Sequence, residues 1–136
     1  MTPDSRKIEE LRRKLIVSKD QLAGEQLEAL VDKASTYCVV DDGGTVHVRD
    51  RKLPKGKQVA LSLIARFLAS MLDQTFSPTL SADDLASFLG CGKAEVVARA
   101  KELVDQGLAL RSGRGKYQAN PVRIDDFFAS LEVRKE

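Results

Sequence analysis

Apolar side chains recur at spacings of three and four along most of this 136-residue chain, a pattern typical of amphipathic helices. The strongest stripe lies within residues 58–74 and consists of Ala60, Leu63, Ile64, Phe67, Leu68 and Met71. Leu61 and Leu72 add apolar surface on another side of the same segment. Residues 58–74 are therefore predicted to form the central helix of the fold.

The first 35 residues show a weaker helical pattern that is interrupted once. Ser5 is a candidate cap, and the apolar positions are Ile8, Leu11, Leu15, Leu27, Leu30, Val31 and Ala34. The pattern falters over residues 18–24, so we expect two helices or one broken helix. Two interpretations of the stripe stay open: it packs within its own chain beneath a solvated charged face, or it packs on its copy in a second subunit.

A hairpin and a cationic loop are predicted before the central helix. Two β-branched runs within residues 37–49 flank Asp-Asp-Gly-Gly, whose residues tolerate the positive φ of tight turns. Residues 49–57 then carry five cations against the single acid Asp50. Because Pro54 and Gly56 disfavour regular structure, we expect an irregular loop here.

The second half of the chain predicts two short helices, a hairpin and a closing helix. Ser81 and Asp84 have the spacing of a capping box, and Gly90 is expected to end the helix that they begin. A second helix is predicted over residues 93–106, and two strands over 108–111 and 116–119 enclose the turn SGRG. After Asn120 and Pro121, the closing helix presents Ile124, Phe127, Phe128 and Leu131 at helical spacing.

Composition limits the chemistry that the chain can carry. The net charge is only +2, so an argument for nucleic-acid binding must rest on where the cations lie. Two distant cysteines and one histidine match neither a disulfide framework nor the usual zinc spacings. The adjacent acid pairs occur where turns and helix starts favour acids. We therefore expect no enzyme activity, no metal and no cofactor.

The location of the protein is also predicted from sequence. The charged N-terminal residues do not have the pattern of a signal peptide, and no apolar run approaches the roughly 20 residues that span a bilayer. We expect a soluble, cytoplasmic protein with no membrane partner.

The order of helix, short capped helix, turn, helix, glycine and two-stranded hairpin resembles the winged helix-turn-helix domains of transcription regulators. The resemblance covers about residues 58–120 and is carried by Leu85, Leu89, Gly90, Val96, Leu103, Gly107, Leu108 and the GRGKY stretch. The closing helix and the first hairpin are similar to uncharacterised winged-helix proteins, of archaeal type. The expected fold class is mainly α with small β-hairpins (α+β). The expected division is an N-terminal helical segment, 1–36, and a winged-helix domain, 37–136.

The resemblance implies binding to double-stranded DNA, with the second helix of the motif in the major groove and the wing on the backbone. Carried over by position, the expected recognition-helix residues are Lys93, Ala94, Glu95, Val97, Ala98 and Lys101. The expected wing contacts are Arg111, Arg114 and Lys116. A second group of phosphate contacts is expected from the basic loop, at Arg49, Arg51, Lys52, Lys55 and Lys57.

The predicted recognition helix differs from helices that recognise bases strongly by hydrogen bonds, because its outward face has no Asn or Gln. The leading expectation is a homodimeric transcription regulator that binds double-stranded DNA. The alternative is a protein-interaction module that uses Ala94, Val97 and Ala98. RNA binding through the basic loops is a third option.

Overall fold

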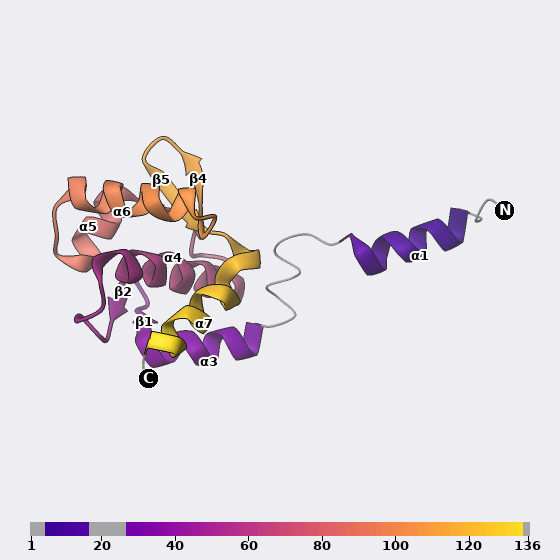
Figure 1. The fold of residues 1–136 in the computed structure, drawn as a ribbon, viewed down its shortest axis with the longest axis horizontal. Coiled ribbons are helices and arrows are strands. Elements are labelled where there is room, and N and C mark those ends of the chain that lie inside the picture. Colours follow the sequence, from indigo (N-terminus) through magenta and orange to yellow (C-terminus); the bar gives the residue numbers. More distant parts are fainter. Residues whose placement is uncertain (1–4, 17–26, 135–136) are drawn as a thin grey trace.

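The computed structural model describes residues 5–16 and 27–134, and Figure 1 shows their arrangement. The elements follow the order α1 (Ser5–Leu15), α3 (Leu27–Tyr37), β1 (Cys38–Val40), β2 (Val46–Val48), α4 (Lys55–Leu72), β3 (Leu80–Ser81), α5 (Ala82–Leu89), α6 (Lys93–Asp105), β4 (Ala109–Gly113), β5 (Lys116–Ala119), η1 (Pro121–Arg123) and α7 (Ile124–Arg134). The expected α+β class, mainly helical with small antiparallel sheets, is confirmed.

Helix α4 is the centre of the fold, as its apolar stripe predicts. Ten of its residues are buried, among them Leu61 and Leu63 on different sides of the helix. Figure 1 shows α5 and α6 on one side of α4, and α3 and α7 on the other. Because other elements surround it, α4 needs apolar residues on more than one side.

The start of α4 differs from the prediction. The helix begins at Lys55 rather than at residue 58, and Pro54 occupies its N-cap position. Proline suits the beginning of a helix, because the first N–H groups have no partner within the helix. The expectation of an irregular chain through Gly56 is wrong, since Gly56 lies in the first helical turn.

The α5–turn–α6 unit forms as predicted. The Oγ of Ser81 accepts a hydrogen bond from the backbone N–H of Asp84 (3.0 Å), and a carboxylate oxygen of Asp84 accepts one from the N–H of Ser81 (3.2 Å). Gly90 ends α5 at φ +63°, a left-handed conformation that glycine adopts without strain. Gly107 follows α6 with φ +79°.

Two small antiparallel sheets complete the fold. The expected first hairpin is β1–β2, in which Val39 lies opposite His47. The second sheet has the order β3-β5-β4, and its outer strand β3 pairs Leu80 with Tyr117. Strand β3 is not predictable from the sequence pattern, because two residues are too few to show a strand periodicity.

Helices α3 and α7 pack against each other on one side of α4. The rings of Tyr37 in α3 and Phe128 in α7 stack with centroids 6.2 Å apart, and Phe127 packs edge-on against Phe128 at 5.9 Å. Leu30, Ala34 and Tyr37 of α3 belong to the same core as α4, although the expected division of the chain lies just after residue 36. By contrast, α1 has no buried residue.

No helix in the described ranges 5–16 and 27–134 combines the length and the apolar character needed to cross a membrane.

Candidate nucleic-acid interface

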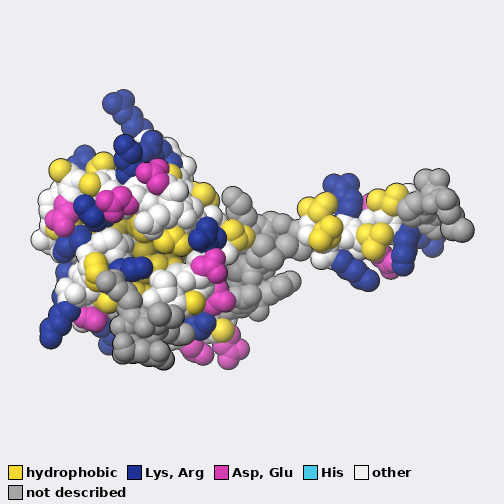
Figure 2. Space-filling model, viewed as in Figure 1, with side chains coloured by type: hydrophobic (Ala, Val, Ile, Leu, Met, Phe, Trp, Pro, Cys, Tyr) yellow, Lys and Arg dark blue, Asp and Glu magenta, His cyan; other side chains and the backbone are white. Residues whose placement is uncertain are grey.

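The tip of the β4–β5 hairpin carries the cationic cluster singled out from the sequence. Gly113 and Gly115 adopt φ values of +137° and +70°, and the strand register shifts between Arg111 and Gly113. Arg111, Arg114 and Lys116, called here the tip cations, are exposed. None of the three forms an ion pair with an acid in the described part of the chain. Figure 2 shows Lys and Arg side chains gathered around this tip, at the top of the view.

Helix α6 exposes the expected face to solvent. All six residues predicted to point outward are exposed: Lys93, Ala94, Glu95, Val97, Ala98 and Lys101. Val96, Ala100 and Leu103 on the opposite face are buried. Arg99, on the flank of the helix, is held by Glu102 at 3.1 Å.

The hairpin tip and the start of α6 both adjoin the first turn of α5. The N–H of Ala82 donates to the carbonyl oxygen of Gly115 at 3.0 Å, which fixes the tip beside the start of α5. The ammonium of Lys93 lies 3.4 Å from a carboxylate oxygen of Asp83 in the same turn. One side of the molecule therefore carries the tip cations and the N-terminal end of α6 together.

The basic loop contributes fewer available cations than expected. Three of its five cations make contacts inside the chain. Arg49 donates to the carbonyl oxygen of Ser35 (3.2 Å), and Arg51 donates to that of Leu89 (3.2 Å). The ammonium of Lys57 lies 3.4 Å from the Oγ of Ser130 and 5.3 Å from the ring centre of Phe127.

The two remaining loop cations differ in setting. Lys52 is exposed and Lys55 is half-buried in the first turn of α4, and neither forms an ion pair among the residues that the structure describes. The loop is thus mainly a structural connection between α4, α5 and α3. Of the five cations predicted to contact phosphate, Lys52 and Lys55 are the two for which the described residues show no side-chain contact of this kind.

A buried glutamine that the sequence analysis missed holds this loop. The side-chain amide of Gln58 donates to the carbonyl oxygens of Leu53 (2.8 Å) and Arg51 (3.1 Å). Buried polar side chains normally satisfy backbone groups in this way. The sequence signal for this role was a single amide side chain near the beginning of a largely apolar helix.

The first hairpin contains an electrostatic contact that was also unexpected. His47 places its Nε2 2.9 Å from a carboxylate oxygen of Asp41. The hydrogen bond with His47 lowers the pKa of Asp41, and the backbone N–H groups of Thr45 and Gly43 lower it further. The carboxylate of Asp41 thereby organises the β1–β2 turn. No group of His, Cys, Asp and Glu side chains among the described residues is arranged to hold a metal ion.

Comparison of the chain with protein-family models, with curated proteins and with solved structures finds no match.

Proposed function

We propose that residues 55–119 form a winged helix-turn-helix unit that binds double-stranded DNA, and that the protein is a transcription regulator. The observation that carries the proposal is the sheet order β3-β5-β4, reached through the sequence α4, β3, α5, α6, β4 and β5. This arrangement places a capped two-helix motif beside a cationic hairpin, which is the combination that a winged helix presents to a duplex.

The chemistry of the hairpin tip suits phosphate. Arginine and lysine side chains supply most contacts to the DNA backbone, and glycines allow backbone N–H groups to approach phosphate oxygens closely. Arg111, Arg114 and Lys116 surround Gly113 and Gly115, and no acid pairs with them in the described chain. The tip is therefore the strongest electrostatic feature of the proposed interface.

Helix α6 contributes shape more than base-specific hydrogen bonds. The arginine, asparagine and glutamine side chains that read guanine and adenine bidentately are missing from its exposed face. Val97, flanked by Ala94 and Ala98, can contact thymine methyl groups. Sequence selectivity in this proposal comes from such apolar contacts and from duplex shape.

Specific binding in this proposal requires a homodimer. One short helix and one hairpin tip offer a small contact area, whereas two copies related by a two-fold axis double it and match a palindromic site. Three tip cations give a salt slope of about −3, and two copies give about −5 to −6. Between about 50 and 200 mM salt, the affinity would then fall roughly fortyfold for one copy and roughly a thousandfold for two.

Salt-titrated binding to a random DNA duplex tests the proposal. We expect a steep negative dependence of log affinity on log salt concentration, with the slope reduced by about one for Arg114→Ala and for Lys116→Ala in each copy. Lys33→Ala is the matched control for Lys116→Ala, because it removes the same charge from an ammonium that pairs with Asp125 at 3.0 Å.

Two results would contradict DNA binding by the tip. One is no binding to duplex DNA at low salt. The other is a slope that Lys116→Ala and Lys33→Ala change equally. Duplex RNA serves as the competitor, and a preference for RNA would replace the DNA assignment with the RNA one.

A protein-interaction module is the second candidate, and one observation favours it. Val97 is one of the few large apolar side chains that the described residues expose, at 37%, and it lies between two alanines on α6. Val97→Lys separates the two functions, since an added cation should strengthen binding to DNA and weaken binding to an apolar protein surface. The DNA measurement uses a random duplex, where loss of a thymine contact has little weight, and weaker binding of Val97→Lys to it would argue against α6 lying close to DNA.

A further inference from the structure

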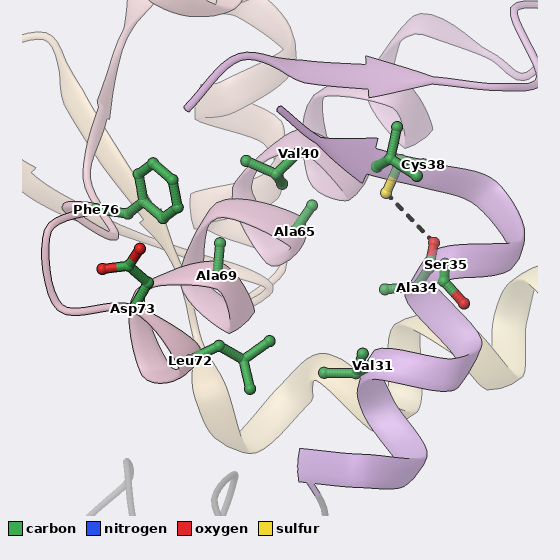
Figure 3. A pocket seen from close by; sticks show the side chains of 11 residues that line it. Val31, Ala34, Ser35, Cys38, Val40, Ala65, Ala69, Leu72, Asp73 and Phe76 are labelled. Carbon is green, nitrogen blue, oxygen red and sulfur yellow. Dashed lines mark hydrogen bonds between the residues drawn. The ribbon is translucent and has the colours of Figure 1, made fainter. Parts of the chain in front are cut away.

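An apolar hollow of about 320 Å³ opens between α3, β1 and the C-terminal part of α4. Figure 3 shows the side chains that surround it, including Val31 of α3, Val40 of β1 and Leu72 of α4. Two of the lining side chains are large, apolar and exposed: Val39 at 41% and Leu72 at 63%. Exposed apolar area of this kind, gathered around a concave surface, is typical of an interaction site.

A second uncovered apolar surface lies on α1. Ile8, Leu11 and Leu15 follow one another at spacings of three and four, so they share one face of the helix. Their exposed fractions are 43%, 49% and 84%, and Ile16 next to the helix is 63% exposed. An amphipathic helix normally buries such a face, and α1 buries none of its residues. Figure 2 shows apolar side chains at the surface of the α1 helix.

The charges around the two surfaces are complementary. Helix α1 carries five cations and two acids: Arg6, Lys7, Arg12, Arg13, Lys14, Glu9 and Glu10. Asp73 lines the hollow, Asp32 follows Val31 on α3, and Asp41 and Asp42 follow Val40 of β1. Hydrogen bonds from the N–H and the hydroxyl of Thr75 lower the pKa of Asp73, so its carboxylate remains ionised at neutral pH.

Two arginines also lie near the hollow and keep their positive charges, and the four acids outnumber these two cations. Arg49 donates to Ser35, and Arg66 donates to Gly44 at 2.7 Å.

We propose that α1 of one chain inserts its apolar face into the α3–β1–α4 hollow of a second copy, and that the exchange is reciprocal. The ten residues 17–26 can span about 35 Å at most, enough for α1 to reach a neighbouring subunit. Among residues 5–16 and 27–134 neither apolar surface is covered, so a second copy supplies what each lacks. Reciprocal insertion gives a closed two-fold dimer that buries both surfaces twice. The inference deepens the homodimer of the proposed function, but its own test needs no DNA.

Light scattering of the full chain tests the dimer. We expect twice the 15.0 kDa chain mass at micromolar concentration and low salt. Leu11→Glu on α1 and Leu72→Lys at the hollow should each reduce the mass to 15.0 kDa. Each substitution places a charge on an apolar contact. That charge is opposite in sign to most of the charges already present around the same surface.

A matched pair of valines provides the control. Val39→Asp changes a residue that lines the hollow, and Val122→Asp changes a valine of η1, and both side chains are 41% exposed. We expect loss of the dimer for Val39→Asp only, because burying a carboxylate against the apolar face of α1 costs more than its attraction to the α1 cations offsets. Mixing the Leu11→Glu chain with the Leu72→Lys chain should restore the doubled mass, since one intact α1 then meets one intact hollow. Recovery on mixing also shows that neither variant fails to fold.

Three outcomes overturn the proposal. A 15.0 kDa wild-type chain excludes the dimer. A dimer that survives both Val39→Asp and Leu72→Lys, but not Leu11→Glu, indicates that α1 packs on α1. In the Leu15→Cys/Leu72→Cys double variant, a disulfide within one chain indicates that α1 covers its own hollow, whereas a disulfide between chains supports the exchange. Lys116→Ala should leave the dimer intact, so failure of DNA binding and failure of the dimer remain distinguishable.

Discussion

The guanidinium of Arg51 lies against the C-terminal end of α5, with its Nη1 3.2 Å from the carbonyl oxygen of Leu89. Its Nη2 lies 3.4 Å from the carbonyl oxygen of Phe88. The last carbonyl groups of a helix have no partners within the helix, and a cation there also interacts favourably with the negative end of the helix dipole. A residue expected to hold DNA phosphate therefore joins the loop before α4 to the helix that precedes α6.

The first prediction concerns this contact. Arg51→Ala should lower the free energy of unfolding by about 1 kcal/mol, because the hydrogen bonds to the α5 carbonyls are lost. Lys52→Ala, next to it in the same loop, removes an exposed cation and should leave stability almost unchanged. Urea unfolding of both variants measures the difference. Equal stability of the two variants would show that the Arg51 contact has no structural value.

The second prediction compares two glycines of the turn between α5 and α6. A methyl group added at Gly90 or at Gly92 would meet no atom within 4 Å, so neither substitution creates a clash. Gly90 has φ +63°, whereas Gly92 has φ −72°. Gly90→Ala should therefore cost about 1–2 kcal/mol of stability from backbone strain alone.

Gly92→Ala is the control, since its backbone conformation is open to any residue. It should change stability by well under 1 kcal/mol, because a more restricted unfolded chain offsets the weaker N-cap. Thermal unfolding of the two variants gives the comparison. A loss for Gly92→Ala as large as that for Gly90→Ala would mean that strain at φ +63° is not the cause.

The third prediction concerns the start of α5. Ser81→Ala removes the oxygen that accepts the hydrogen bond from Asp84 N–H, and should cost about 1 kcal/mol. Asp84→Ala should cost a similar amount, and the double variant less than the sum, because the two side chains form one reciprocal unit. Ser81→Thr retains the hydroxyl and should remain close to wild type. Additive losses in the double variant would contradict the coupling.

Most of the fold is encoded in local patterns, which explains what the sequence predicted well. The apolar stripe of α4, the glycine at position 90 and the Ser81–Asp84 spacing each act within a few residues, so they can be read without tertiary information. The two-residue strand β3 cannot be read this way, because it exists only through pairing with Tyr117 and Lys116 of β5. The start of α4 was misplaced because proline and glycine were read as breakers, although proline favours the first position of a helix.

The candidate site was predictable only in part, and the reason lies in long-range contacts. The exposed face of α6 follows from its helical period alone. Whether a loop cation is available depends on distant partners, and Arg51 and Lys57 find theirs 38 and 73 residues along the chain. The tip cations differ because Gly113 and Gly115 place them at the exposed end of a hairpin.

The last prediction follows from the burial of Cys38 at the floor of the apolar hollow. Burial raises the pKa of the Cys38 thiol from 9.0 to about 11, and the positive charge of Arg49 lowers it only slightly in return. At a pH below 9 the thiol is protonated and poorly nucleophilic, since the thiolate is the reactive form. Iodoacetamide should therefore label the half-buried Cys91 well before Cys38, as peptide mass spectrometry of the native chain would show.

The raised pKa of Cys38 also makes the free energy of unfolding depend on pH. Below pH 9 the Cys38 thiol is protonated in both the folded and the unfolded chain. Its contribution to the free energy of unfolding is therefore fully present. As the pH rises from 9 to about 11, the unfolded chain loses the proton first, and the free energy of unfolding falls by up to about 2–3 kcal/mol. Cys38→Ser removes the titration and should show a shallower loss over this range than wild type in urea unfolding. Parallel pH profiles for the two chains would mean that Cys38 ionises as easily in the folded protein as in the unfolded one, and would contradict a pKa raised by burial.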